Sequence, residues 1–179
     1  MPLVWVTGTP GVGKSTVCGI LKSRARLAVD ADWEGYNHWV DRRSGQVVAD
    51  PPYPVPAGWL DRFAWRIARG TVEALAAQAH DQTAFLFGSV ENEVEVWDLF
   101  DLVICLVVDN ATLRRRLSGR TTNTFGSHPE ELAAAVEWND RAESTYQRFG
   151  ATIIDGRLPP TAVADAVLTA AAKLPARPE

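Results

Sequence analysis

One octapeptide constrains the fold of this chain more than any other feature. Residues 8–15 read GTPGVGKS and match the spacing G-x-x-x-x-G-K-[ST]. The apolar run LVWVT precedes them, and Val17, Ile20 and Leu21 follow at helical spacing. Glycines let backbone amides turn inward around phosphate oxygens, and the start of a helix adds its positive dipole end. The sequence therefore predicts a strand, a phosphate-binding loop and a helix, in that order.

The loop also predicts cofactors. A lysine at the seventh position reaches the β and γ phosphates of a nucleoside triphosphate, and a serine or threonine after it ligates Mg²⁺. We therefore expect ATP and Mg²⁺ to bind here. The residues expected to contact the nucleotide are Gly8, Thr9, Pro10, Gly11, Val12, Gly13, Lys14, Ser15 and Thr16. The loop does not by itself name a reaction, because GTPases, ATP-driven machines and small-molecule kinases share it.

Composition narrows the class of protein. The chain has 179 residues, 46% of them apolar, and 18 Lys and Arg against 22 Asp and Glu give a net charge of −4. These values predict one domain over residues 1–179. No apolar run approaches the roughly 20 residues of a membrane helix, and the mild acidity argues against a nucleic-acid partner. The N-terminus has no secretory pattern, so we expect a cytoplasmic protein whose Cys18 and Cys105 are reduced.

Apolar runs alternate with segments of helical periodicity along the chain. Runs of strand length cover 3–7, 26–30, 83–88, 101–109 and 151–155. Later helical patterns cover 59–78, 111–120, 129–149 and 160–174, the third of them opened by Ser127 or His128. This alternation predicts an α/β fold, a three-layer sandwich with five parallel strands. The segments 33–58 and 121–128 are irregular, which in a compact domain is typical of functional connections.

Two aspartates follow the second predicted strand. Asp30-Ala31-Asp32 resembles the D-x-D of shikimate kinase. With the loop, it makes the chain resemble the small nucleoside, nucleotide and metabolite kinases that include adenylate kinase and shikimate kinase, with their P-loop NTPase fold. The resemblance implies that Asp30 and Ser15 serve Mg²⁺ and that Asp32 holds or deprotonates an acceptor hydroxyl. The alternative is a pair of turn carboxylates. Asp109, which ends the run 101–109, is a further metal candidate or a helix cap.

An arginine pair marks the expected lid. Arg116 and Arg120 lie in RLSGR, which is similar to the start of the adenylate kinase lid, here about 119–130 with its centre at Thr121–His128. The resemblance implies that Arg116 stacks on adenine and Arg120 clamps the transferring phosphoryl group, tasks that suit a planar guanidinium. The alternative is a solvated basic end of a helix.

Two further arginines have weaker matches. Arg141 lies in the helix after the lid, where shikimate kinase carries an arginine that returns to the phosphates; it is equally placed for an i,i+4 ion pair with Glu137. Arg157 follows Asp155-Gly156 in a segment that resembles the adenine-lining loop of these kinases, although glycine after a strand is typical of any turn.

The acceptor is expected over residues 31–82, which are rich in aromatic residues: Trp33, Tyr36, Trp39, Tyr53, Trp59, Phe63 and Trp65. Such rings stack on flat or sugar-like faces, or they cover the segment's own small core. No cation follows the third sheet strand, where Glu91 and Asn92 favour an uncharged or cationic acceptor. Helically spaced arginines could hold an acceptor anion or form a solvated face; they are Arg62, Arg66 and Arg69.

The resemblance implies an ATP-dependent kinase that transfers the γ-phosphoryl group to a hydroxyl of a small, ring-bearing molecule. Lys14, Arg120 and Arg141 would balance the charge of the phosphoryl group, and Asp32 would receive the proton. Two alternatives stay open: a nucleoside monophosphate kinase, and an ATP-binding regulatory module without acceptor chemistry. The residues do not name the acceptor, the ligand of Mg²⁺ among the aspartates, or the oligomeric state.

Overall fold

The five predicted strands form one parallel sheet. The computed structural model describes residues 2–79, 82–120, 123–126 and 128–175. Its sheet has the order β2-β5-β1-β6-β7. The strands are β1 (Leu3–Thr7), β2 (Leu27–Asp30), β5 (Ala84–Phe87), β6 (Leu102–Val107) and β7 (Thr152–Asp155). Each lies inside a predicted run, which confirms the five-stranded parallel sheet.

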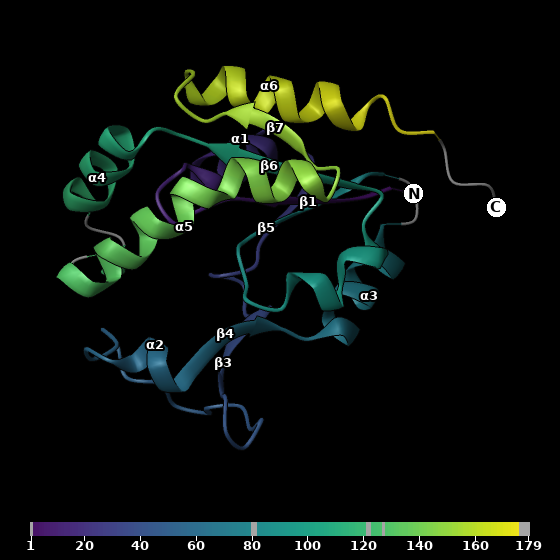
Figure 1. Cartoon of the computed structure of the whole chain (residues 1–179). Coiled ribbons are helices and arrows are strands. Elements are labelled where there is room, and N and C mark those ends of the chain that lie inside the picture. Colours follow the sequence, from purple (N-terminus) through teal and green to yellow (C-terminus); the bar gives the residue numbers. More distant parts are fainter. Residues whose placement is uncertain (1, 80–81, 121–122, 127, 176–179) are drawn as a thin grey trace.

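Helices cover both faces of this sheet, and the result is the predicted three-layer α/β sandwich (Figure 1). α1 (Lys14–Ser23) and α6 (Pro160–Ala171) pack over Val4 and Val6 on one face. α3 (Arg69–Gln78) packs over Leu3 and Trp5 on the other face, where Tyr146 of α5 (Pro129–Arg148) contacts the Thr7 hydroxyl. Alternate residues of β1 thus enter two cores, which explains why its apolar run is unbroken.

The segment 59–78 is not the single helix that its pattern predicts. It contains a short helix α2 (Trp59–Arg62), then strand β4 (Phe63–Ile67), and only then α3. β4 pairs in antiparallel fashion with β3 (Asn37–Asp41), with Trp39 opposite Trp65. Aromatic residues favour a strand when a partner strand is present, and this partner lies in the irregular segment 33–58. The resulting hairpin projects from the sandwich on the side of β5 (Figure 1).

The remaining elements begin and end close to their predicted positions. α4 spans Asn110–Gly119, and two short 3₁₀ turns follow β5, η1 (Glu93–Glu95) and η2 (Trp97–Leu99). His128 is the N-cap of α5, as one of the two predicted starts requires. Thr121, Thr122 and Ser127 of the expected lid lie outside the described residues. None of the helices in the described part of the chain is long and apolar enough to span a membrane.

Candidate active site

The phosphate loop joins β1 to α1, and its glycines have backbone conformations that other residues avoid. The φ angles of Gly8, Gly11 and Gly13 are 134°, 97° and 113°. A Cβ atom on Gly8 would lie 2.4 Å from the backbone oxygen of Leu106. Glycine at these positions therefore lets the backbone turn tightly next to β6, so that successive amides can face a phosphate chain. This cradle fits the expected triphosphate.

Gly8→Ala should destabilise the fold by about 3 kcal/mol, because it combines a positive φ with a backbone clash. Gly19→Ala is the matched control, since Gly19 lies inside α1 and a Cβ there meets nothing within 4 Å. That control should stabilise the protein by roughly 1 kcal/mol. Urea unfolding of both variants measures the difference. Equal midpoints for the two variants would contradict the loop geometry.

Lys14 lies buried at the centre of the loop. Its Nζ donates to the backbone oxygens of Gly8 at 2.5 Å and Thr9 at 3.3 Å. Burial lowers the pKa of Lys14, and the nearby carboxylates of Asp32, Glu93 and Asp30 oppose this shift. A cation in such a dry site interacts strongly with phosphate oxygens.

Oxygen ligands for a metal ion meet beside the loop. Asp30 ends β2 and is buried, and it accepts a hydrogen bond from the Ser15 hydroxyl. Burial is the main cause that raises the pKa of Asp30. A hydroxyl and a carboxylate side by side are ligands that Mg²⁺ prefers, so these two residues fit the predicted ion. Asp109 instead caps α4, where Oδ1 accepts from the Thr112 amide at 2.7 Å. The structure thus favours the capping role of Asp109.

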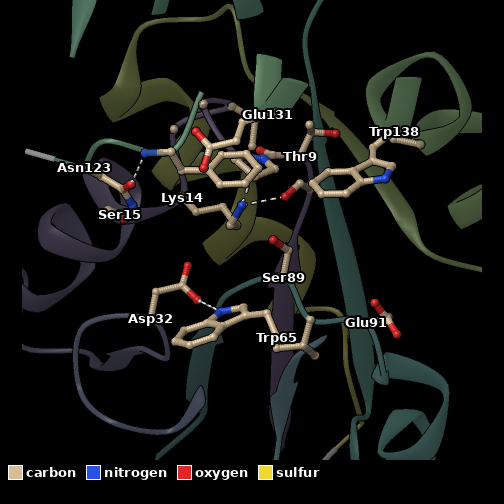
Figure 2. Close-up of a pocket in the computed structure, with 18 of the residues that line it drawn as sticks. Thr9, Lys14, Ser15, Asp32, Trp65, Ser89, Glu91, Asn123, Glu131 and Trp138 are labelled. Atoms are coloured by element: carbon tan, nitrogen blue, oxygen red, sulfur yellow. Dashed lines mark hydrogen bonds between the residues drawn. The ribbon is translucent and has the colours of Figure 1, made fainter. Parts of the chain in front are cut away.

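The hairpin orients Asp32 (Figure 2). Oδ1 of Asp32 accepts a hydrogen bond from Asn37 Nδ2 at 2.6 Å and another from Trp65 Nε1 at 2.8 Å. Asn37 begins β3 and Trp65 lies in β4, so both strands of the hairpin contribute a donor. Among the described residues, no side chain or amide donates to Oδ2 of Asp32. That oxygen is left for a ligand in the cavity, which Asp32 lines.

Arg116 and Arg120 both line the same cavity. Arg116 donates from Nη1 to the oxygen of Val12 at 2.8 Å and from Nη2 to that of Gly156 at 2.9 Å. These in-plane bonds fix the guanidinium between the phosphate loop and the segment after β7. Nη2 of Arg120 donates to the backbone oxygen of Phe125, whereas its Nε is buried without a partner. An orphaned donor of a cation fits an anionic ligand.

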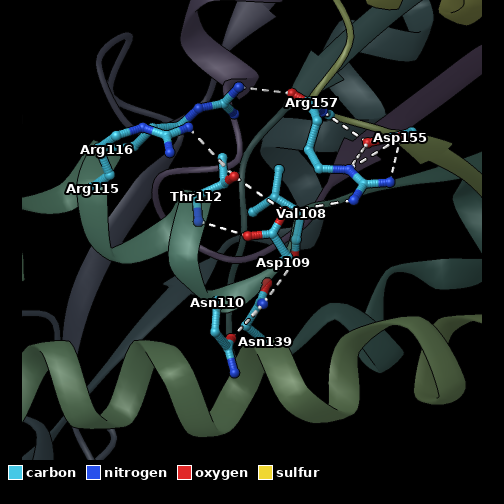
Figure 3. Close-up of polar contacts among 10 residues, drawn as sticks. Val108, Asp109, Asn110, Thr112, Arg115, Arg116, Asn139, Asp155 and Arg157 are labelled. Carbon is cyan, nitrogen blue, oxygen red and sulfur yellow. Dashed lines mark hydrogen bonds and ion pairs between the residues drawn. The ribbon is translucent and has the colours of Figure 1, made fainter.

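Arg141 and Arg157 are less well placed. Arg141 lines the cavity but forms the ion pair with Glu137 at 2.7 Å that its spacing allows. Arg157 contacts Asp155 at 2.8 Å and Asp109 at 3.5 Å (Figure 3). It is absent from the cavity lining, although its neighbour Gly156 is part of that lining. The structure therefore does not bring Arg157 to the other predicted nucleotide ligands.

The cavity, of about 1390 Å³, extends from the phosphate loop between the hairpin and α5. Five of the seven predicted aromatic residues line it: Trp33, Trp39, Tyr53, Phe63 and Trp65. Trp59 instead stacks on Phe63 with ring centroids 3.9 Å apart, and Tyr36 packs against the core that contains Trp5. The aromatic segment thus provides a cavity wall and also covers its own small core.

Ion pairs decide which charges remain free at the hairpin. Glu91 lines the cavity but pairs with Arg42, which is also part of the lining. Asn92 is buried and bonds both the amide and the oxygen of Ile67, so it anchors the hairpin and does not face an acceptor. Three arginines pair with carboxylates and are absent from the lining of this cavity: Arg62 with Asp41, Arg66 with Glu95, and Arg69 with Asp98.

Glu93 is a residue of the site that no motif in the sequence indicates. This buried residue of η1 lines the cavity. Its Oε1 accepts from the Thr7 hydroxyl at 2.7 Å, and its Oε2 accepts from the Tyr146 hydroxyl at 2.6 Å. Burial raises the pKa of Glu93, and the hydrogen bonds oppose this shift. The three residues come from β1, η1 and α5, so no local pattern in the sequence reveals their contact.

Comparisons with solved structures give the same fold. A gluconokinase from Sinorhizobium meliloti 1021 has 17% identity and a TM-score of 0.55, with 96% of this chain and 92% of that chain covered. A shikimate kinase from Aquifex aeolicus vf5 has 14% identity and a TM-score of 0.57, with 95% and 96% covered. A deoxyadenosine kinase from M. mycoides with bound dATP has 11% identity and a TM-score of 0.52, with 96% and 100% covered.

Sequence comparison adds the family. A search among curated proteins finds no match. The model of the family described as AAA domain matches residues 4–137, which include the phosphate loop, the hairpin and the first part of α5. Together with the structural neighbours, this match confirms the resemblance seen in the sequence. The chain belongs to the AAA domain family, and its fold is that of the P-loop small-molecule kinases.

Proposed function

We propose that the protein is an ATP-dependent kinase that transfers the γ-phosphoryl group to a hydroxyl of a small, ring-bearing molecule. One observation carries the proposal: Lys14 and Asp32 line the same cavity, and Oδ2 of Asp32 accepts no hydrogen bond from the described residues. A cation for the phosphates and an acceptor for the hydroxyl proton are the two groups that such a transfer requires. The kinases among the structural neighbours support the assignment.

The nucleotide end of the cavity would hold ATP. The loop amides and Lys14 would bind the phosphates, and Arg116 would place one face of its guanidinium against the base. Ser15 and Asp30 would hold Mg²⁺, which neutralises phosphate charge when bound. Arg120 would direct its unpartnered Nε toward the transferring group. Arg141 would also contact the transferring group. For this it would leave Glu137, and the exposed ion pair that it gives up contributes little free energy.

Asp32 would act on the acceptor. The acceptor hydroxyl would donate its proton to Oδ2 while its oxygen forms the new bond to the γ-phosphorus. The bond between that phosphorus and the β–γ bridging oxygen breaks, ADP leaves, and the proton passes from Asp32 to solvent. Because the transition state is loose, orientation of the hydroxyl matters more than the basicity of Asp32. The bonds from Asn37 and Trp65 supply that orientation.

The charges at the hairpin favour an acceptor without a phosphate. A phosphorylated acceptor needs cations, preferably arginines with free guanidinium groups. The arginine that lines the hairpin side of the cavity is Arg42, and its guanidinium is bonded to Glu91. This arrangement favours sugars, nucleosides or aminocyclitols over nucleoside monophosphates.

Coupled ADP release across nucleosides, sugars, aminoglycosides and nucleoside monophosphates tests the proposal. We expect release well above slow ATP hydrolysis with at least one unphosphorylated hydroxyl acceptor. The best rate with AMP, CMP, UMP, GMP or dTMP would instead identify a nucleoside monophosphate kinase. ATP binding without stimulated release by any acceptor would indicate a nucleotide-binding module.

A further inference from the structure

We propose that the acceptor carries a basic amino group and that the carboxylate of Glu93 binds it, while Asp32 receives the acceptor hydroxyl. This inference rests on the proposed function and narrows the acceptor to hydroxylated amines, such as amino sugars and aminocyclitols. It starts from a buried carboxyl group that the transfer step does not use.

Glu93 is a carboxylate without an ion pair. Its side chain is 8% exposed, and both oxygens accept hydrogen bonds from neutral hydroxyl groups. Within the described ranges, no Lys, Arg or His nitrogen lies within 4.0 Å of it. Hydroxyl donors satisfy its geometry but leave its charge uncompensated, and a buried carboxylate without a cation is costly. The position of Glu93 in the cavity lining lets a ligand provide that cation.

Two cations of the cavity lining are paired with carboxylates: Arg42 with Glu91, and Arg141 with Glu137. Lys14 is the cation whose charge interacts with Glu93, but its Nζ donates to the oxygens of the phosphate loop. Once ATP is bound, Lys14 would serve the phosphates. Glu93 is then left without an ion pair among the residues that the structure describes, and repulsion between its carboxylate and the phosphates adds to the need for a positive group.

One aromatic residue contacts this carboxylate, and two more rings continue from it along the cavity lining. Tyr146 donates to Glu93 and stacks with Trp97 at a centroid distance of 6.2 Å, and Trp97 lies 5.7 Å from the ring of Phe149. All three rings line the cavity, and Phe149 is an exposed residue. Aromatic faces beside a carboxylate are a combination that binds ammonium groups through cation–π and charge-assisted contacts. A neutral hydroxyl group would need neither the aromatic faces nor the carboxylate.

Matched pairs of ligands test the proposal. Amino sugars and aminocyclitols, each beside its N-acetylated form, are titrated calorimetrically into protein that holds Mg²⁺ and a non-hydrolysable ATP analogue. We expect at least one amine to bind about tenfold or more tightly than its N-acetylated form. Glu93→Gln should reduce this ratio to near one and change the affinity for the ATP analogue by less than about threefold. Equal affinities within every pair, or no amine binding at all, would overturn the proposal.

The variant preserves the local geometry. Glutamine has the shape of glutamate, and the hydroxyls of Thr7 and Tyr146 can rotate to donate or accept. Because burial disfavours the ionised form of Glu93, the variant should unfold in urea at the same or a higher concentration than the wild type near pH 7. If Glu93→Gln fails to fold, the wild-type affinities within each pair still decide the proposal.

ADP release separates this inference from the proposed function. Amine binding that depends on Glu93, without ADP release, would support the amine site and overturn the kinase reaction. ADP release that is equally fast with amines and their N-acetylated forms, and unchanged in its preference by Glu93→Gln, would overturn the amine site and support the kinase. In that case Glu93 would only balance the charge of Lys14.

Discussion

Lys14→Ala should abolish the thermal stabilisation that MgATP gives to the wild-type protein. A ligand at 100 times its dissociation constant stabilises by about 2.7 kcal/mol, which corresponds to roughly 5–10 °C for a chain of this size. Lys14 is buried in the loop, where low polarity strengthens its attraction to phosphate oxygens. Without the Lys14 side chain, almost all of the increase in melting temperature caused by MgATP should be lost. Differential scanning fluorimetry with and without MgATP measures the effect.

Lys22→Ala is the control for this experiment. Lys22 lies on the same helix but forms an exposed ion pair with Glu34. Removing an exposed ion pair has little effect on stability, so this change should not alter the binding of MgATP in the loop. This variant should keep the wild-type shift. An unchanged MgATP shift in Lys14→Ala would mean that the nucleotide binds elsewhere, and the proposed function would then lose its basis.

The phosphate loop and the sheet could be predicted because their signals are local. The spacing of glycines, lysine and serine fixes the turn at residues 8–15, and five unbroken apolar runs fix the strands. The hairpin could not be predicted in the same way. FAWRI at 63–67 continues a helical pattern, and its strand conformation depends on Asn37–Asp41, a partner more than twenty residues earlier. Pairing at this distance overrides local propensity.

The site shows the same division. Ser15 and Asp30 meet, as the resemblance of their two motifs to the kinase family implies, although β5 lies between β1 and β2 in the sheet. The orientation of Asp32 depends on Asn37 and Trp65, which approach it only because the hairpin forms. Glu93 in η1 contacts Thr7 in β1 and Tyr146 in α5, and the spacing of these three residues in the sequence does not predict that they meet.

Asp32→Asn should lower the rate of phosphoryl transfer by about 10²–10⁴-fold and leave MgATP binding nearly unchanged. The asparagine oxygen can still accept the hydrogen bonds of Asn37 and Trp65, so the hairpin should keep its position. The other carboxylate oxygen is replaced by an amide nitrogen, which can neither orient the acceptor hydroxyl by accepting its hydrogen bond nor take its proton. Steady-state kinetics with the best acceptor of the ADP-release panel, together with MgATP titration, separates transfer from binding.

Trp65→Phe distinguishes the charge of Asp32 from its orientation. Phenylalanine keeps an aromatic wall in the cavity but removes the Nε1 donor at 2.8 Å from Asp32. Because Asn37 still holds the same oxygen, we expect a smaller fall in kcat, about tenfold, with little change in the KM of the acceptor. Full turnover in Asp32→Asn would remove Asp32 from the proton-accepting role. Full turnover in Trp65→Phe alone would show that Asn37 suffices to orient it.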